Sequence, residues 1–109
     1  MIRINVFRDK KRRIYRVHIK GHANFADYGE DIVCAAVSGI VIGLTNATEE
    51  LLGVRLHPPH VAEGDLDLRV PERIEAKRLA QVELLLEAMV SSLRYIAADA
   101  PNHVRIEDK

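Results

Sequence analysis

The alternation of apolar and polar residues near the start of the chain predicts two β-strands. The stretches IRINVFRD and RIYRVHIKG each place an apolar side chain at every second position, which is the period of a half-buried strand. Between them, Asp9–Arg13 (DKKRR) supplies a charged hairpin turn. Four consecutive cations are also compatible with an RNA contact, but a solvated turn is the better interpretation because the chain as a whole is neutral.

A long apolar segment in the first half of the chain predicts a helix that is buried on more than one side. Asp31 is a suitable N-cap because its carboxylate accepts hydrogen bonds from backbone N–H groups, and Gly53 is a suitable C-terminal stop. Ala35, Gly39 and Gly43 recur every four residues, so another element can approach the helix backbone closely along this stripe. The stripe fits ordinary packing on a sheet, and it also fits a helix–helix contact across a dimer.

The second half of the chain repeats the pattern of strands followed by a helix. GVRLHPPHV and GDLDLRV predict a second pair of strands. From Glu72, apolar residues at three-and-four spacing predict an amphipathic helix that Pro101 ends, with Glu83, Glu87 and Arg94 pointing outward. The positions expected in the core are Leu79, Val82, Leu86, Met89, Leu93 and Ile96.

These elements predict an α+β fold. HVRIEDK adds a short last strand, so the element order is ββαββαβ. Because the strands come in hairpins, we expect a mostly antiparallel sheet of about five strands, with the two long helices packed on one face.

Length and composition place the chain in the class of ordinary globular domains. The 109 residues predict a single domain over residues 1–109, and 16 basic against 16 acidic side chains give no net charge to attract nucleic acid. The longest apolar run, Ile32–Leu44, is too short to span a bilayer, so we expect a cytoplasmic protein without a membrane partner. His57 and His60 flank two prolines without a third ligand nearby, so we expect neither a metal nor another cofactor.

Cys34, the only cysteine, has two interpretations. If the helix starts after Asp31, the thiol lies at the third helical position, where unpaired N–H groups and the helix dipole favour a thiolate. Glu30 and Asp31 oppose this effect because nearby negative charge disfavours a thiolate. Alternatively, Cys34 is a small apolar side chain in the core.

His22 lies twelve residues before the cysteine and favours a catalytic role for the thiol. A strand that ends at Gly21 and a loop that returns to the helix start can bring imidazole and thiol together as base and nucleophile. Asp31 either orients the imidazole or caps the helix. Ser38, one turn beyond Cys34, either lines the site or bonds back to a helix carbonyl.

The sequences GHA at residues 21–23 and GEDIVCAAVS at residues 29–38 are similar to the signature of the ribosomal-processing cysteine protease (Prp) family. The resemblance extends over essentially the whole chain. It implies a homodimeric cysteine endopeptidase that removes the N-terminal extension of a large-subunit ribosomal protein through an acyl-enzyme. It also implies that Cys34 is the nucleophile and His22 the general base and acid, with Asp31 and Ser38 at motif positions near the site.

The resemblance gives a function to the loop between the histidine and the cysteine. It implies a mobile loop, so we expect the segment from Asn24 to Gly29 to act as a gate for the peptide, with Gly21 and Gly29 as its two ends. The acidic side chains of the loop, Asp27 and Glu30 among them, have no cation nearby in the sequence, so we expect them to attract a basic protein tail.

Two other functions compete with the protease. A non-catalytic ribosome-associated binding module would use the cationic turn on RNA, and Cys34→Ala would leave its function intact. A thiol redox sensor would need an accessible cysteine of low pKa, but the chain lacks a second cysteine to resolve the oxidised form.

Overall fold

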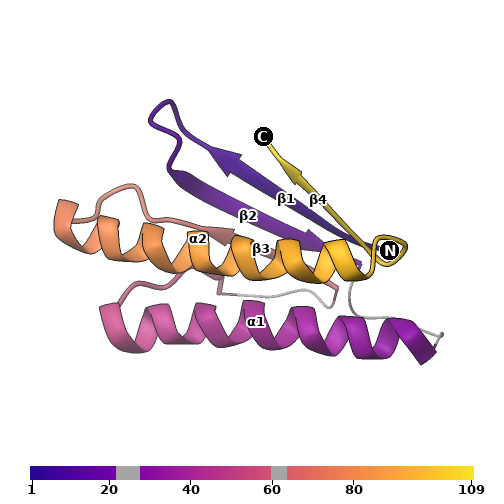
Figure 1. Cartoon of the computed structure of the whole chain (residues 1–109). Coiled ribbons are helices and arrows are strands. Elements are labelled where there is room, and N and C mark those ends of the chain that lie inside the picture. The colour runs from indigo at the N-terminus through magenta and orange to yellow at the C-terminus, as the bar shows by residue number, and fades with distance from the viewer. Residues whose placement is uncertain (22–27, 60–63) are drawn as a thin grey trace.

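The fold consists of one sheet with two long helices on one of its faces (Figure 1). The computed structural model of the chain describes residues 1–21, 28–59 and 64–109, with the backbone alone at residues 28–31. In chain order the elements are β1 (Ile2–Arg8), β2 (Ile14–Lys20), α1 (Tyr28–Leu52), β3 (Asp65–Arg69), α2 (Ala76–Asp99) and β4 (Val104–Asp108). The predicted α+β class and the placement of both helices on one face are therefore confirmed, and the charged turn at Asp9–Arg13 joins β1 to β2 as expected.

The sheet is mixed and has four strands in the order β3-β2-β1-β4, which corrects the expectation of about five mostly antiparallel strands. β2 pairs antiparallel with both β1 and β3, whereas β4 pairs parallel with β1. It follows that β3 and β4 run in the same direction on opposite edges. Two parallel strands need a crossover connection, and α2 is that crossover.

The predicted strand in GVRLHPPHV is absent from residues 53–59. Val54 and Leu56 are buried, so the segment contributes to the core. Its one backbone bond to a strand among the described residues runs from the amide of Arg69 to the carbonyl of Leu56, at 2.8 Å. Pro58 and Pro59 have no N–H to donate, so the segment packs against the sheet without extending it.

The buried face of α2 agrees closely with its apolar spacing. Val82, Leu86, Met89 and Leu93 are buried as expected, and the predicted positions at the two ends of the stripe are only partly buried. The helix begins at Ala76 instead of Glu72, because the segment that follows β3 bends before it becomes helical.

Two acids of α2 contact the sheet instead of pointing into solvent as predicted. Glu83 accepts a hydrogen bond from the backbone amide of Ile14 at 2.7 Å. Glu87 accepts two bonds from the guanidinium group of Arg8, at 2.6 and 3.1 Å. These acids therefore tie α2 to the ends of β1 and β2 next to the hairpin turn.

One face of α1 belongs to the core and the opposite face is open. Among residues 32–52 of α1, the buried side chains are Cys34, Val37, Val41, Thr45 and Thr48. On the open side, Ile32 is 61% and Ile42 is 49% exposed. By helix length and mean hydropathy alone, Ile32–Leu52 would suffice to cross a membrane, which the length of the apolar run Ile32–Leu44 did not indicate. Core helices of water-soluble proteins also satisfy this criterion.

Candidate active site

Cys34 lies in the second turn of α1, because the helix starts at Tyr28. The sequence predicted Asp31 as the N-cap and Cys34 as the third helical residue, and both expectations are wrong. Asp27, an equally suitable cap by residue type, directly precedes Tyr28 in the sequence. The backbone amide of Cys34 is therefore within reach of an intrahelical carbonyl, and the thiol lies beyond the unpaired N–H groups of the first turn.

The Cys34 side chain belongs to the hydrophobic core, and the residue is only 6% exposed. A reacting carbonyl must come within about 3–3.5 Å of a nucleophile. A peptide can therefore reach the sulfur only if groups packed around it move. This burial agrees with the interpretation of Cys34 as a core residue, and the catalytic interpretation requires such a movement.

The end of β2 holds the residue before His22 in a fixed position. Gly21 has a φ of +84°, and its amide donates to the carbonyl of Gly64 at 2.9 Å. A Cβ atom at Gly21 would lie 2.6 Å from the backbone oxygen of Met1. Gly21, which the sequence predicts as one end of a gate, is a packed junction between the starts of β1 and β3.

His22 itself and Asn24 lie outside the described residues, so the imidazole–thiol pair stays a prediction. β2 ends and α1 begins at the same end of the molecule (Figure 1). Ile19, two residues before Gly21, shares a small surface notch with Val37 of α1. The strand that leads to His22 therefore lies beside the helical turn that follows Cys34.

Ser38 lines the same notch, between α1, β2 and β3, together with Ile19 and Leu66. The notch has a volume of about 10 Å³, which is the space of one water molecule. Among the described residues, no hydrogen bond of the Ser38 hydroxyl is found, whereas Thr48 bonds back to the carbonyl of Leu44 at 2.7 Å. Ser38 is therefore a polar group on the surface next to Cys34, and the alternative of a back-bonded hydroxyl is not observed.

The backbone also changes the predicted boundaries of the gate. Gly29 lies in the first turn of α1, so it cannot be the C-terminal end of a loop. Asp31 is also inside the helix, so it is not the N-cap. Of the two roles predicted for Asp31, the one that is left is orientation of the imidazole. Its catalytic role stays a prediction, because the side chains of residues 28–31 are outside the described part of the structure.

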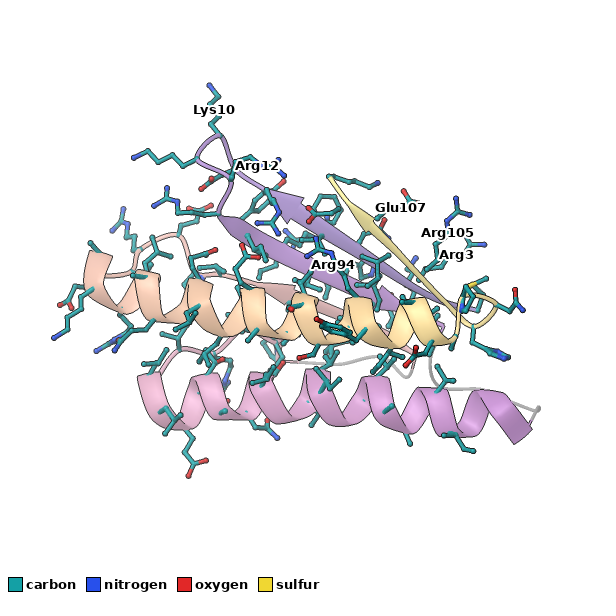
Figure 2. The ribbon with its side chains drawn as sticks, in the orientation of Figure 1. Arg3, Lys10, Arg12, Arg94, Arg105 and Glu107 are labelled. Carbon is teal, nitrogen blue, oxygen red and sulfur yellow. The ribbon has the colours of Figure 1, made fainter. Side chains whose placement is uncertain are left out.

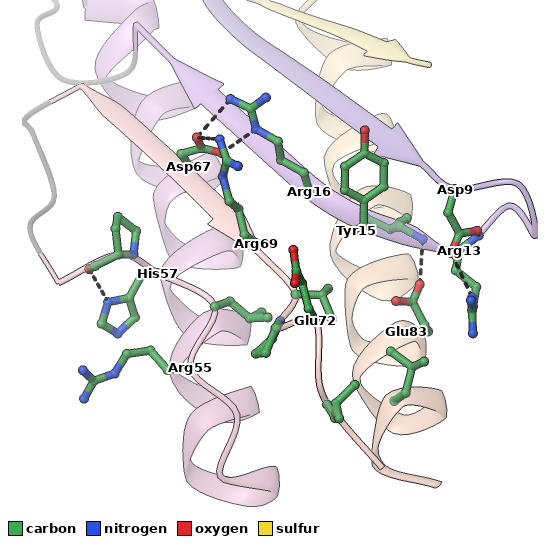
Figure 3. A pocket seen from close by; sticks show the side chains of 17 residues that line it. Asp9, Arg13, Tyr15, Arg16, Arg55, His57, Asp67, Arg69, Glu72 and Glu83 are labelled. Atoms are coloured by element: carbon green, nitrogen blue, oxygen red, sulfur yellow. Dashed lines mark hydrogen bonds and ion pairs between the residues drawn. The ribbon is translucent and has the colours of Figure 1, made fainter. Parts of the chain in front are cut away.

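A cavity of about 750 Å³ lies at the far end of α1 (Figure 3). It is bordered by the segment after α1, the start of β2, the end of β3 and the start of α2, and its lining includes Tyr15, Arg16, Arg55, His57 and Asp67. Cys34 precedes the end of α1 by eighteen residues, which is about 27 Å at 1.5 Å per residue. The cavity is therefore separate from the cysteine.

The charges that line the cavity largely neutralise one another. Arg16 donates to Asp67 at 2.8 and 3.0 Å, and this bond holds the pKa of Asp67 below its usual value. Burial raises the pKa of Glu83. His57 contacts the carboxylate of Glu49 at 3.3 Å, and His60 lies outside the described residues. Among the described residues no group of three or more potential metal ligands is found.

Comparison with known proteins gives one consistent result. The family model described as cysteine protease Prp matches residues 1–105. The chain is 33% identical over 107 residues to the ribosomal processing cysteine protease Prp of Bacillus subtilis, covering 97% of this chain and 96% of the relative.

Two solved structures of the Prp protease from Staphylococcus aureus also resemble the chain. The complex with a substrate peptide has a TM-score of 0.86 at 25% identity, and the complex with a covalently linked product peptide has a TM-score of 0.75 at 26% identity. In both comparisons the whole of each chain is covered. Because the family model and a relative above 30% identity both extend over nearly the full length, the chain belongs to the Prp family of cysteine proteases.

Proposed function

We propose that the chain is an endopeptidase in which Cys34 is the nucleophile and His22 the general base and acid. The Cys34 sulfur attacks the peptide carbonyl as a thiolate, and the protonated imidazole of His22 gives its proton to the leaving amine. The resulting thioester is hydrolysed by water, which releases the new carboxylate and regenerates the thiol. The observation that carries this proposal is the position of Cys34, the only cysteine of a cysteine protease: the helical turn that follows it lies beside the strand that leads to His22.

The proposed substrate is the precursor of a large-subunit ribosomal protein, from which the enzyme removes the N-terminal extension in the cytoplasm. Support comes from the relatives, which are named ribosomal processing proteases, and from the Staphylococcus aureus protein, which was solved with a substrate peptide and with a covalently linked product. A covalent product is the form expected when a cysteine nucleophile carries the acyl group.

The test is incubation of the purified protein with the unprocessed ribosomal protein, followed by mass measurement of the products. We expect a single cut by the wild type, and no cut by Cys34→Ala or His22→Ala. No second thiol can take over the reaction in Cys34→Ala, because the chain has one cysteine only. The proposal fails if Cys34→Ala still cuts, or if the wild type leaves the precursor intact.

Ser38 is proposed to contact the substrate beside the nucleophile. Its hydroxyl lies on the notch one turn from Cys34 and makes no hydrogen bond to the described residues. Ser38→Ala should raise KM with little change in stability, whereas Thr48→Ser, which keeps the bond to the Leu44 carbonyl, should leave KM unchanged. A Ser38→Ala variant with wild-type KM and kcat would contradict this role.

The acids between the histidine and the cysteine are proposed to attract the basic tail of the substrate. The double variant Asp27→Asn/Glu30→Gln removes two carboxylates without a large change in size. Because exposed charges are screened over about 10 Å at 0.1 M salt, the loss in substrate affinity should be largest at low ionic strength. A loss that does not depend on salt would contradict this hypothesis.

A second copy of the chain is the proposed partner for the open face of α1. Ile32 and Ile42 are exposed there, and a Cβ atom built at Gly39 or Gly43 meets nothing within 4 Å. The two glycines of the stripe thus make no close contact with the described residues, which leaves room for a close helix–helix approach. Sedimentation should give a dimer for the wild type and a monomer for Ile42→Glu; a monomeric wild type would exclude the homodimer.

A further inference from the structure

The face of the sheet that the helices do not cover carries an excess of positive charge. Side chains of β1 to β4 that alternate away from the core form this open face, and Figure 2 shows Arg3, Arg105 and Glu107 pointing away from the helices. Its strand cations outnumber its strand carboxylates by five to three. The cations are Arg3, Arg16, Lys20, Arg69 and Arg105, and the carboxylates are Asp65, Asp67 and Glu107.

Three of these cations lie directly opposite one another across three strands. Arg3 of β1 is the register partner of Lys20 in β2 and of Arg105 in β4. We call these three residues the cation row. With a strand spacing of about 4.8 Å, the row extends over about 10 Å. Like charges directly opposite one another destabilise a sheet, so the fold tolerates this arrangement at a cost in stability.

The neighbouring carboxylates neutralise the cation row only in part. Asp65, the register partner of Lys20, contacts the Nε2 atom of His18 at 2.6 Å. Glu107 forms a long ion pair with Arg105, at 3.8 Å from its Nε atom, and this distance is beyond that of a hydrogen bond. For Arg3 and Lys20, no ion pair with a described residue is found. With three cations beside two carboxylates, the row therefore presents a net positive charge to solvent.

We propose that the cation row binds the phosphate backbone of RNA. Two of its three side chains are arginines, whose planar guanidinium groups bind phosphate through paired hydrogen bonds. A membrane surface would also call for apolar side chains among the cations. Among the described strand residues, the one exposed large apolar side chain is Tyr15, which lies at the opposite end of β2 from Lys20. The inference rests on the proposed function, because a protease that acts on a ribosomal protein works where ribosomal RNA is present.

The binding is independent of base sequence, because the aromatic rings of the described strands lie away from the row. The Phe7 ring is covered by the guanidinium carbon of Arg16 at 4.7 Å and the ammonium nitrogen of Lys109 at 5.6 Å. Tyr15 lines the cavity at the far end of the sheet. A base beside the row therefore has no free strand ring on which to stack, and the contacts are made to phosphates. The neutral total charge, which argued against nucleic acid, conceals this uneven distribution.

The experiment measures fluorescence anisotropy of a short labelled single-stranded RNA, in two unrelated sequences, over a range of salt concentrations. Each phosphate contact contributes about −0.7 to the slope of log K against log salt for a single strand, so the row should contribute about −2. Replacing all three row residues by Gln should remove that part of the slope. The matched control replaces Arg73, Lys77 and Arg78 by Gln; these exposed residues lie just before α2 and in its first turn. The control, like the row, loses two arginines and one lysine, so the change in charge is the same.

Two further measurements keep the outcomes distinct. The row variant should melt at the same or a higher temperature than the wild type, because like-charge repulsion is removed, and it should cut the isolated precursor at the wild-type rate. If the wild type does not cut the precursor, the proposed function is overturned but the RNA site is not. Equal RNA affinity of row variant and control would overturn the RNA site. A wild type that binds polyglutamate but not RNA would also overturn it, and would show that the row takes an acidic protein instead.

Discussion

Replacing Gly21 by Ala should destabilise the fold more than the same replacement at Gly53, the other turn glycine whose surroundings the structure gives. Gly21 has a φ of +84°, a region that side chains with a Cβ atom rarely adopt. In addition, the new Cβ would lie 2.6 Å from the backbone oxygen of Met1. Gly53 is the matched comparison, because its φ is +68° but a Cβ there meets nothing within 4 Å.

The clash at Gly21 is costly because the Met1 carbonyl cannot turn away freely. That carbonyl shares a planar peptide unit with the amide of Ile2, which donates to the carbonyl of His103 at 2.7 Å. The left-handed conformation costs about 1–2 kcal/mol at either glycine, and overpacking adds about 1–3 kcal/mol at Gly21. We therefore expect losses of about 2–5 kcal/mol for Gly21→Ala and about 1–2 kcal/mol for Gly53→Ala.

Urea denaturation of the two variants and the wild type measures both losses under the same conditions. The free energy of unfolding should fall in the order wild type, Gly53→Ala, Gly21→Ala, without a change in the slope against urea. If the two variants are equally stable, the contact with Met1 costs nothing and the reasoning about the planar peptide is refuted. Because Gly21 directly precedes His22, cleavage of the precursor by folded Gly21→Ala should also be slower than by Gly53→Ala.

The remaining predictions concern charged groups between the sheet and α2. Burial raises the pKa of Glu83, so the folded state favours the protonated form of this side chain and loses stability as pH rises through the raised pKa. Glu83→Gln should therefore have a higher melting temperature than the wild type at neutral pH. A lower melting temperature would contradict this. The Arg8 side chain is 9% exposed and bonds to Glu87 and Asp108, so Arg8→Met should cost about 1–2 kcal/mol at neutral pH by urea denaturation, given the exposure of Glu87. Arg94→Met, which removes an exposed ion pair with Asp108, should cost under about 0.5 kcal/mol. If Arg8→Met and Arg94→Met cost the same, the explanation from burial of Arg8 is refuted. Arg8 also holds the pKa of Asp108 below its usual value, so the pair stabilises the fold above the ordinary carboxyl pKa, and this stability is lost as pH falls through the lowered pKa. The melting temperature of Arg8→Met should therefore fall less on acidification than that of the wild type.

Much of the site follows from local sequence signals. The only cysteine, Cys34, and the His22 motif are visible in the sequence, and the family comparison agrees with the resemblance they carry. The start of α1 was placed wrongly because Asp27 and Asp31 are both suitable N-caps, and residue type alone does not decide between them. The anchoring of Gly21 by Met1 and Gly64 could not be predicted, since these residues lie far apart in the chain.

The sequence by itself determined β1, β2 and the core face of α2, because period-two and three-and-four spacing of apolar residues depend only on which side of an element is buried. Only the tertiary structure decided that β4 joins β1 in parallel and that residues 53–59 stay outside the sheet, since pairing depends on where the chain returns. The same holds for the cation row: Arg3, Lys20 and Arg105 come from three strands, and their repulsion exists only once the register is formed.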